Sequence, residues 1–545
     1  MPLMSLFKLL RREVRGSRWD ILLAVVISGG ANTAILAVVN SAAETASFEA
    51  LNFRLFVIFA IALPLYAVAL RYTFDAATLI FEQILTNVRA RFVTEVVNSE
   101  LLLLHQVGRA RIFQSIVQDT SIISESQGLM VAAAHSAVMV TFTALYVLTM
   151  SLAAFLTIAG VVFLGATLYQ LRQAAVMESL NASVQEEIRF IGGIEDLIDG
   201  LKEVKLSRSR GQELLEDLSR ITASMRDLKI KTINGYNAGA VFAQCFFYVL
   251  IAIVVFVLPR LVEDIAPVVP QLVATILFLI GPLSTVVSAL PALTKSNRAA
   301  DSLTQLEHDL ASMIGDQVAA AAPCPAEFAA AIEVRDVSFR YPGTDVSSFR
   351  IGPIDLVVPF GRIVMIIGGN GSGKTTFLKV LAGLYAPTTG SILLDGRLIE
   401  ADRLQDYREL FSAIYSDFHL FRKLYGVAAE ADEIDRRLRQ MGIADKVRYG
   451  SDGFSNLDLS TGQRKRIGMV VTLLEDRPVL IFDEWAADQD PDFRRYFYEE
   501  LLPELNRMGK TLLVATHDDR YFKMADIVVK IEQGRIQSIR RRRKA

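Results

Sequence analysis

A glycine-rich stretch in the C-terminal half has the residue types and spacing of a phosphate-binding loop. It reads Gly368, Gly369, Asn370, Gly371, Ser372, Gly373, Lys374 and Thr375, which is the pattern G-x-x-x-x-G-K-[ST]. Such glycines let backbone N–H groups turn toward phosphate oxygens, while Lys374 can neutralise the β- and γ-phosphates and Thr375 can ligate Mg²⁺. An apolar run at 362–367 precedes the loop and a helix-like segment begins at Thr376. This strand–loop–helix context predicts a nucleotide site at a helix N-terminus.

Three further segments carry residues suited to phosphate chemistry. Residues 479–484 form an apolar run that ends in Asp483 and Glu484. The first carboxylate of such a pair can serve Mg²⁺ and the second can polarise a water molecule. Residues 459–463 precede this run and His517 follows it. Each segment alone is a weak signal, but their order and spacing together are specific.

Composition sets limits on the rest of the chain. It has 545 residues, 52% of them hydrophobic, and a net charge of −2. Its mean hydropathy is +0.36, which is high for a chain that carries a nucleotide site. The length suggests two to four domains, and the charge gives no argument for a nucleic-acid partner. The two cysteines, Cys245 and Cys324, give neither a disulfide framework nor a metal-ligand spacing.

Six apolar runs in the first half are each close to the length that crosses a bilayer. They are Ile21–Val39, Leu55–Leu70, Leu129–Met150, Leu152–Tyr169, Val241–Leu258 and Leu272–Leu290. The third and fourth have almost no polar hinge between them, but their combined length requires two crossings. The first could instead be a signal peptide, although it is longer than a typical signal core and more spans follow. We therefore expect six spans.

The distribution of charge predicts how the spans are oriented. The N-terminal segment is basic, as are the two long polar stretches at 71–127 and 170–231, whereas 42–53 has no Lys or Arg. The positive-inside rule therefore places the N-terminus, both stretches and the C-terminal half in the cytoplasm. Apolar and basic residues alternate within 1–18 in the manner of an amphipathic helix that lies on a membrane surface.

The two long polar stretches are expected to continue as helices. Their apolar residues recur at three-to-four spacing with few breakers, and Gly192-Gly193 and Gly200 are candidate turns. A separate soluble helical domain is the alternative. Within the spans, Asn32, His135 and Gln244 are polar. Such residues either face a transport pathway or join helices by hydrogen bonds, and the sequence leaves both open.

A soluble α/β domain is predicted for the rest of the chain. Hydropathy falls after the Ala- and Pro-rich segment 319–325, and short β-like runs such as 332–334 begin. The expected division is an amphipathic helix at 1–18, a six-span domain at 19–310, a linker at 311–327 and the α/β domain at 328–545. The fold class is thus a multidomain membrane protein, a six-helix transmembrane domain followed by an α/β phosphate-loop cassette.

With these segments in order, the chain resembles the ATP-binding cassette (ABC) transporters over nearly its whole length. Six spans followed by one cassette are similar to an exporter half-transporter that works as a homodimer in the bacterial inner membrane, with its cassette in the cytoplasm. The resemblance implies an ATPase with ATP and Mg²⁺ as cofactors, and lipids and a transported molecule as partners, without nucleic acid.

The resemblance also implies roles for individual residues. Tyr341 would stack on adenine, Gly368 to Thr376 would bind the phosphates together with Lys374, and Thr375 and Asp483 would serve Mg²⁺. Glu484 would be the catalytic carboxylate and His517 the switch histidine. The signature motif would comprise Leu459, Ser460, Thr461, Gly462 and Gln463, with Thr461 where Gly is more common. Asp490 ends the segment that stands at the D-loop position, and it would join the ATP site.

Variant details narrow the resemblance to exporters of cyclic peptides and peptide siderophores, such as the pyoverdine and syringomycin exporters. The segments that carry it are 200–206, 416–421, 459–466 and 483–491. This branch implies ATP-driven export of a peptide-like molecule. A lipid or hydrophobic-drug flippase of the same architecture is one alternative, and a nucleotide-gated membrane scaffold that transports nothing is another.

The sequence departs from the general ABC pattern at two places. Gly450 to Gly453 stand where multidrug exporters have a Glu-rich segment, and Ser416 stands where most cassettes have the Q-loop glutamine. Ser is shorter than Gln, and a carboxylate is the better Mg²⁺ partner. We therefore expect either Ser416 or Asp417 to face the metal, and we expect Asp417 to matter more.

Overall fold

The chain forms two compact units in the computed structural model, which describes residues 4–13, 19–44, 52–262, 265–311, 330–341 and 349–542. The helical unit comprises Met1–Thr94 and Ala110–His308, and the second unit comprises Glu95–Arg109 and Asp309–Ala545. The linker predicted at 311–327 lies outside the described residues from position 312 onward, as does the predicted start of the α/β domain at 328.

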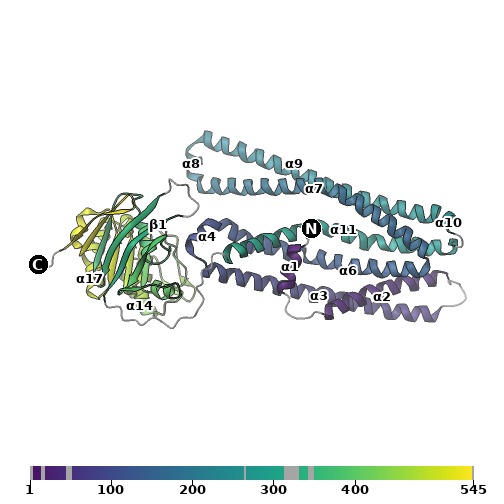
Figure 1. Cartoon of the computed structure of the whole chain (residues 1–545), viewed down its shortest axis with the longest axis horizontal. Coiled ribbons are helices and arrows are strands. Elements are labelled where there is room, and N and C mark those ends of the chain that lie inside the picture. The colour runs from purple at the N-terminus through teal and green to yellow at the C-terminus, as the bar shows by residue number, and fades with distance from the viewer. Residues whose placement is uncertain are drawn as a thin grey trace. The chain divides into compact units, whose positions relative to one another are not determined.

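The helical unit consists of long helices joined by short connections (Figure 1). Its elements are α1 (Met4–Glu13), α2 (Trp19–Glu44), α3 (Phe53–Asn98), α5 (Arg109–Phe113), η1 (Gln114–Asp119), α6 (Thr120–Met150), α7 (Leu152–Asp199), α8 (Leu201–Leu206), α9 (Arg208–Ala252), η2 (Ile253–Val257), α10 (Leu258–Leu261), η3 (Ala266–Val268) and α11 (Val269–Ala311). Within the described residues, 6 helices are long and apolar enough to cross a membrane. The predicted number of spans is confirmed.

The third and fourth spans are separated by a single residue. Ser151 has extended backbone angles, and its hydroxyl accepts a hydrogen bond from the Ala154 N–H group at the start of α7. Serine favours this position because its side chain satisfies a backbone donor that the first turn of a helix leaves free. One capped residue therefore turns the chain where the sequence has almost no polar hinge.

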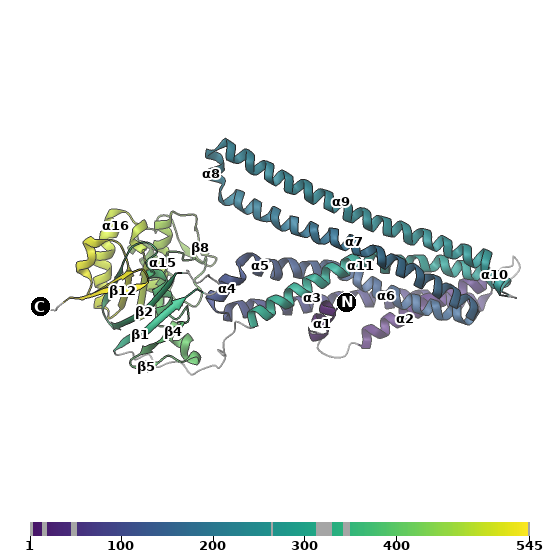
Figure 2. The ribbon, with the colours of Figure 1, turned by 45° about the horizontal axis from the view of Figure 1, so that its top comes forward.

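Helices α7 and α9 run side by side as a hairpin that α8 closes, in both ribbon views (Figures 1 and 2). Gly200 lies at the junction of α7 and α8, as predicted. The turn predicted at Gly192-Gly193 is wrong, because both residues lie inside α7. A Cβ atom at Gly193 would come within 2.6 Å of Leu218 Cδ2 on α9. The glycine therefore serves close helix packing and not a turn.

The apolar side of α1 is covered by protein, where the sequence predicted a membrane surface. Leu6 and Leu9 are buried. The Asn297 side-chain oxygen on α11 accepts hydrogen bonds from the backbone N–H groups of Ser5 and Leu6, at 3.2 and 3.1 Å. Arg12 pairs with Glu307, also on α11, at 2.8 Å. Helix α1 is thus attached to α11 by polar contacts at both of its ends.

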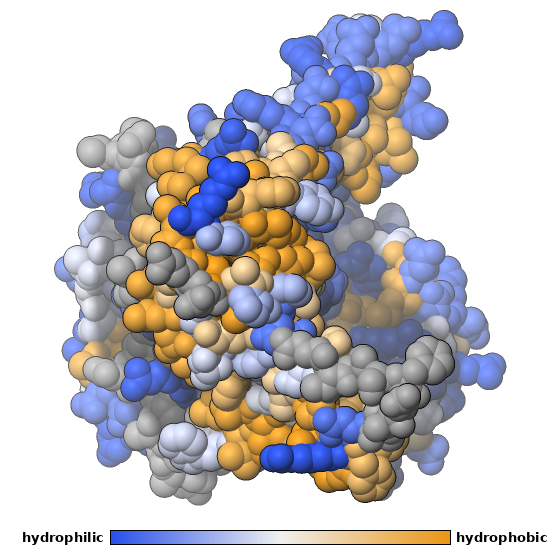
Figure 3. All heavy atoms as spheres, turned by 90° about the vertical axis from the view of Figure 1, so that its right-hand side faces the viewer, coloured by the Kyte–Doolittle hydropathy of each residue, from blue (hydrophilic) through white to orange (hydrophobic). Residues whose placement is uncertain are grey.

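Large apolar side chains cover the outside of the helical unit. Phe163 on α7 and Phe256 in η2 are 75% and 71% exposed, and Figure 3 shows a broad hydrophobic area on the visible face. Polar residues of the spans differ in burial: Asn32 and His135 are buried, whereas Gln244 is exposed. The Asn32 amide donates a hydrogen bond to Met139 Sδ at 3.2 Å, which joins α2 to α6.

The second unit is an α/β cassette to which the short helix α4 (Leu101–Val107) belongs. Its strands are β1 (Ala331–Arg340), β2 (Arg350–Pro359), β3 (Ile363–Ile367), β4 (Thr389–Leu394), β5 (Arg397–Leu398), β6 (Phe411–Ile414), β7 (Tyr449–Gly450), β8 (Gly453–Phe454), β9 (Val479–Asp483), β10 (Thr511–Ala515), β11 (Ile527–Glu532) and β12 (Arg535–Arg541). Its helices are α12 (Lys374–Leu381), η4 (Ala401–Arg403), α13 (Leu404–Arg408), α14 (Ala431–Gln440), α15 (Thr461–Glu475), η5 (Trp485–Asp488), α16 (Pro491–Tyr496), η6 (Phe497–Leu501), α17 (Leu502–Arg507) and η7 (Asp519–Met524).

The strands form two main sheets and a hairpin. The larger sheet has the order β12-β11-β3-β10-β9-β6, and its strands are parallel except for β12. The smaller sheet is antiparallel with the order β2-β1-β4-β5, and β7 pairs with β8. The strands β3, β9 and β10 are almost wholly buried and apolar, as strands covered on both faces must be.

Two hydrophobic cores enclose the larger sheet. One joins the antiparallel sheet to α12 and includes Phe377 and Ile354, and Leu101 and Leu102 of α4 pack against it. The other lies among α14, α15 and the helices after residue 490. The C-terminal arginines up to Arg541 belong to β12, which pairs with β11 at the edge of the larger sheet. Residues 543–545 lie outside the described part of the chain.

Candidate nucleotide site

The glycine-rich loop connects β3 to α12, as the sequence predicts. A Cβ atom at Gly368 would collide with the Ile531 carbonyl oxygen, so only glycine fits between the loop and β11. Gly373 has φ +101° directly before α12, and a Cβ atom there would lie 2.7 Å from the Ile351 side chain. The two glycines thus shape a loop whose tip, Gly369 to Gly371, is exposed.

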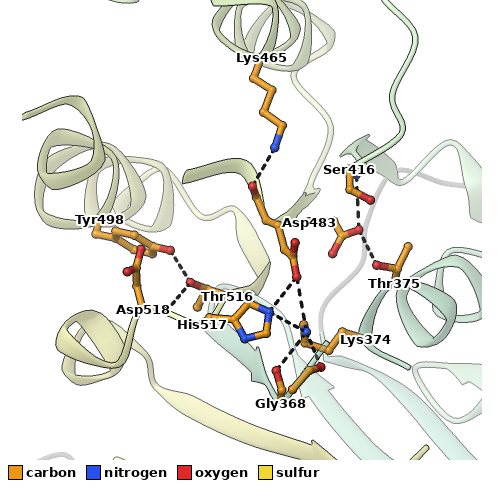
Figure 4. Close-up of polar contacts among 12 residues, drawn as sticks. Gly368, Lys374, Thr375, Ser416, Lys465, Asp483, Tyr498, Thr516, His517 and Asp518 are labelled. Carbon is orange, nitrogen blue, oxygen red and sulfur yellow. Dashed lines mark hydrogen bonds and ion pairs between the residues drawn. The ribbon is translucent and has the colours of Figure 1, made fainter. Parts of the chain in front are cut away.

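Lys374, the first residue of α12, turns its ammonium back over this loop. Nζ donates hydrogen bonds to the carbonyl oxygens of Gly368 and Gly369, both at 3.1 Å. It also lies 3.0 Å from His517 Nε2 and 3.5 Å from Glu484 Oε1. The side chain is buried, and Figure 4 shows Lys374 beside His517. A concentrated positive charge therefore stands at the mouth of a loop of backbone amides.

The sheet order explains why residues far apart in sequence meet here. Strand β10 pairs in parallel with both β3 and β9, so the carboxyl ends of all three strands lie at one edge. Asp483 ends β9, Glu484 follows it, and His517 comes two residues after β10. The predicted phosphate loop, carboxylate pair and histidine are thereby brought together.

Asp483 is fully buried and receives hydrogen bonds on one oxygen. The Thr375 hydroxyl donates to Oδ2 at 2.7 Å, and the Ser416 backbone N–H donates to the same atom at 3.4 Å. Burial raises the pKa of Asp483, the hydrogen bonds from Thr375 and Ser416 oppose this, and the charge of Glu484 adds to it. The other oxygen, Oδ1, is buried without a hydrogen-bond partner among the described residues.

Glu484 has φ +50°, an uncommon conformation for a residue with a side chain. Its Oε1 lies 2.9 Å from His517 Nε2. The same nitrogen faces the Lys374 ammonium, so it cannot donate to Glu484 and accept from Lys374 at once. The proton on His517 therefore decides which of the two oppositely charged neighbours the imidazole binds.

A second layer of contacts fixes the segment that carries His517, directly after β10. The Thr516 hydroxyl lies 2.6 Å from the Tyr498 hydroxyl and accepts from the Asp518 N–H group at 3.1 Å (Figure 4). Burial raises the pKa of Tyr498 to about 12. The phenol is therefore a permanent neutral hydrogen-bonding group that holds the residue next to His517.

Tyr341 and Thr376 meet at the start of α12. Their hydroxyls lie 3.1 Å apart, and the Tyr341 ring contacts the edge of Tyr385 with centroids 6.0 Å apart. An aromatic side chain is thus placed close to the phosphate loop.

The remaining predicted residues lie apart from this cluster. Ser460 caps α15 by accepting from the Gln463 N–H group, and the Gln463 side chain accepts from the Ser460 N–H group, which is a capping box. Thr461 is exposed at the same helix start. Asp490 caps α16 through Phe493, which together with Arg466 lowers the pKa of Asp490.

Asp417, which was expected to face the metal, lies beside Lys379 of α12. Its carboxylate pairs with Lys379 Nζ at 3.0 Å, and Ser416 is the residue that reaches Asp483. Burial lowers the pKa of Lys379, but the Asp417 hydrogen bond and the nearby tyrosines raise it on balance. The ammonium on α12 competes for this carboxylate, a contact that residue type alone could not predict.

Lys465 is a buried contact of the site that the motifs did not indicate. Its Nζ donates to the Glu484 carbonyl oxygen at 2.8 Å and lies 2.7 Å from Asp488 Oδ2. Only a weak signal in the sequence could have indicated this pair. Lys465 lies on the buried face of α15, and the acidic Asp488 follows Glu484 by four residues.

Comparisons with known proteins show the family to which the chain belongs. The ABC transporter family model matches residues 351–487. The chain is 32% identical to the ATP-binding protein SyrD of Pseudomonas syringae pv. syringae over 95% of this chain and 93% of that one. The chain belongs to the ABC transporter family. This confirms the family predicted from the motifs, and the similarity to SyrD agrees with the predicted exporter branch.

Two further comparisons bear on the fold of this ABC transporter. It is 34% identical over 219 residues to the ATP-dependent lipid A-core flippase of Yersinia pestis, a match that covers 38% of this chain and 37% of that one. It superimposes on the structure of a bacterial Atm1-family ABC exporter with ATP bound, with a TM-score of 0.76 and 17% identity over 97% and 96% of the two chains. The protein is a multi-pass membrane ATPase with a cytoplasmic cassette.

Proposed function

We propose that this protein is a homodimeric exporter that uses ATP hydrolysis to move a peptide-like molecule, such as a cyclic peptide or a siderophore precursor, outward across the bacterial inner membrane. The observation that supports this most directly is the cluster of Lys374, Glu484 and His517 at a phosphate loop, joined to a unit with 6 candidate spans. A complete set of hydrolytic groups argues against a scaffold that merely binds nucleotide.

The proposed chemistry is attack of water on the γ-phosphate. Lys374 and the loop amides would stabilise the charge that develops on the phosphoryl oxygens. Glu484 would orient or deprotonate the water, and His517, 2.9 Å from Glu484, would hold that carboxylate in place. Tyr341 would stack on the adenine, which suits an aromatic ring set beside the start of α12.

Magnesium fits the residues beside the loop. The buried Asp483 Oδ1 has no hydrogen-bond partner among the described residues, and the other carboxylate oxygen, Oδ2, accepts from the Thr375 hydroxyl. A carboxylate and a hydroxyl are the hard oxygen donors that suit this ion together with phosphate oxygens. Thr375 and Asp483 would hold the ion, which when bound supplies further neutralisation of the transferred phosphoryl group.

The signature segment would act on the nucleotide of a second copy. Ser460 and Thr461 are exposed at the N-terminus of α15, a 15-residue helix whose dipole favours a phosphate there. Their contacts within the chain are those of a helix cap, away from Lys374. Two cassettes would therefore enclose two ATP molecules, and closing them would switch the helical units between inward- and outward-facing arrangements.

The range of the sequence similarity supports a peptide-like cargo. The match to SyrD covers 95% of the chain and hence both units, whereas the match to the flippase covers 38%. The route of the cargo passes through the spans, so a likeness that includes them bears more strongly on the cargo. A lipid or hydrophobic-drug flippase is the second candidate, because the flippase is also a relative.

Reconstitution in proteoliposomes tests the cargo. We expect ATP-dependent uptake of a fluorescent cyclic lipopeptide or siderophore peptide into inside-out vesicles, together with stimulated ATPase. The E484Q protein is the control, because it should bind ATP without sustaining uptake. Stimulation and movement of lipid probes alone would favour the flippase, and ATPase without movement of either cargo would contradict both.

A further inference from the structure

The turn that carries Glu484 is attached to α15 by contacts that cross between two segments. The Lys465 ammonium donates to the Glu484 carbonyl oxygen at 2.8 Å and lies 2.7 Å from the Asp488 carboxylate. In the opposite direction, the Trp485 indole N–H donates to the Lys465 carbonyl oxygen at 2.9 Å. Lys465 is 2% exposed, so these partners satisfy a charge that is shielded from water.

Neighbouring residues also join the start of α15 to the turn after β9. Arg466 Nε donates to Gln489 Oε1 at 2.9 Å, and the same guanidinium pairs with Asp490. The Gln489 amide in turn donates to the Gly462 carbonyl oxygen at 3.0 Å. A side chain at Gly462 would collide with the Asp488 carbonyl oxygen, so the two backbones are in close contact. The start of α15 and the turn after β9 thus form one tightly joined body.

The conformation of Glu484 needs such support. With φ +50° and ψ 33° it occupies the left-handed region, which is costly for a residue with a side chain and persists where surrounding contacts impose it. Its N–H donates to the Ala515 carbonyl oxygen at 3.1 Å, and its carbonyl oxygen accepts from Lys465. The backbone is therefore held from β10 on one side and from α15 on the other, which aims Oε1 at His517.

We propose that Lys465 is a positioning residue for hydrolysis. Its buried ammonium holds the carbonyl oxygen of the left-handed Glu484, and so directs the carboxylate toward His517 and Lys374. Asp488 keeps the ammonium in place. The inference rests on the proposed catalytic role of Glu484, and it adds a group that acts on that role from outside the nucleotide motifs.

The cassette contains a matched control for this arrangement. Asp476 also has φ +50°, its carbonyl oxygen accepts from Lys510 Nζ at 2.8 Å, and its carboxylate lies 2.7 Å from the same ammonium. Asp476 and Lys510 precede β9 and β10, whereas Glu484 and His517 follow them. The control contact therefore lies at the opposite ends of the same parallel strands, away from the nucleotide site.

Steady-state ATPase of the full-length protein in liposomes tests the inference. We expect K465M to lower kcat by about 10- to 100-fold with little change in the KM for ATP, because misdirecting a reacting group costs rate more than binding. K465Q should restore much of the loss, since its amide can still donate to the Glu484 carbonyl oxygen. K510M, the matched control, should keep wild-type kcat although it loses the same kind of pair.

If K465M folds, three outcomes would overturn the inference. One is wild-type kcat in K465M while E484Q is inactive, which leaves the proposed role of Glu484 intact. Another is an equal change of kcat in K465M and K510M, which would reduce Lys465 to a structural residue. Active E484Q would remove the catalytic role itself and the positioning role with it. If K465M does not fold, D488N replaces it: a lower kcat at unchanged KM supports the inference, and an unchanged kcat overturns it.

Discussion

Gly368 of the cassette and Gly193 of the helical unit pack closely against different kinds of atoms. In the cassette, a methyl group at Gly368 would collide with the Ile531 carbonyl oxygen, which is part of the sheet backbone. In the helical unit, one at Gly193 would meet the flexible end of Leu218, 2.6 Å away. A carbonyl oxygen in a sheet cannot yield without breaking hydrogen bonds, whereas a leucine can change rotamer. The phosphate loop is therefore fixed in shape, and the α7–α9 hairpin can repack.

This difference suits the two tasks of a transporter. Phosphoryl transfer depends on groups held in place before the reaction, so rigidity around Lys374 lowers the cost of reorganisation. Alternating access requires helices to shift against one another, and small rearrangements of packed side chains permit that. The contact that joins α7 to α9 at Gly193 is of the second kind.

The largest effect is expected at the centre of the rigid unit. K374A removes the ammonium that contacts the loop carbonyls, Glu484 and His517. Because the developing phosphoryl charge loses its nearest cation, ATPase should fall by at least about 10²-fold. Phosphate release by the reconstituted protein measures it, with K510A as the control. ATPase near the wild-type rate in K374A would contradict the assignment of the nucleotide site.

The second prediction concerns the loop backbone itself. G368A forces the loop away from β11, since the added methyl group has no space beside Ile531. We expect ATP affinity to drop by about 10-fold or more and the melting temperature of the cassette to fall, because overpacking against backbone costs about 1–3 kcal/mol. G450A is the control, as nothing lies within 4 Å of a Cβ atom there. Equal ATP binding by the two variants would contradict the rigid loop.

The same distinction explains which parts of the site the sequence could predict. The residues of the phosphate loop, Asp483, Glu484 and His517 follow from motif spacing, because adjacent parallel strands bring their carboxyl ends together. Ser416 reaches Asp483 through its backbone N–H, a contact that side-chain chemistry does not reveal.

Packing between distant segments accounts for what the sequence could not give. Gly192-Gly193 reads as a turn from the sequence, and only the approach of Leu218 explains why Gly193 lies within a helix. Lys465 lies two residues after the signature motif, and nothing in the sequence pairs it with Asp488, which lies 23 positions away. In the spans, hydropathy predicts the number of helices but not which side of each one faces the cargo.

The third prediction separates a backbone contact from a side-chain contact. S416A keeps the N–H that reaches Asp483, so its Mg²⁺ dependence of ATPase should stay close to wild type. D417A removes the carboxylate that pairs with the Lys379 ammonium. Because the pair is partly exposed, the loss should lower the stability of the protein by about 1 kcal/mol. A Mg²⁺ titration and thermal unfolding of both variants test this. If D417A changed the Mg²⁺ concentration required for ATPase without changing stability, Asp417 would be assigned a role in binding Mg²⁺.

The smallest effect is expected in the helical unit, at the contact between α7 and α9. It tests most closely the contrast between packing against backbone and packing against a side chain. G192A and G193A each replace a mid-helix glycine of α7, and the gain in helix propensity should stabilise by about 0.5–1 kcal/mol. Gly192 has open space around its Cβ position, so G192A should show the full gain. At Gly193 the methyl group meets Leu218, whose movement should cancel part of it. The double variant G193A/L218A removes that obstacle. Unfolding midpoints of the three proteins, compared with an L218A reference, measure the difference. If G193A instead destabilised the protein by about 1–3 kcal/mol, as expected for a clash with backbone, the α7–α9 contact would be as rigid as the phosphate loop, and the contrast between Gly368 and Gly193 would fail.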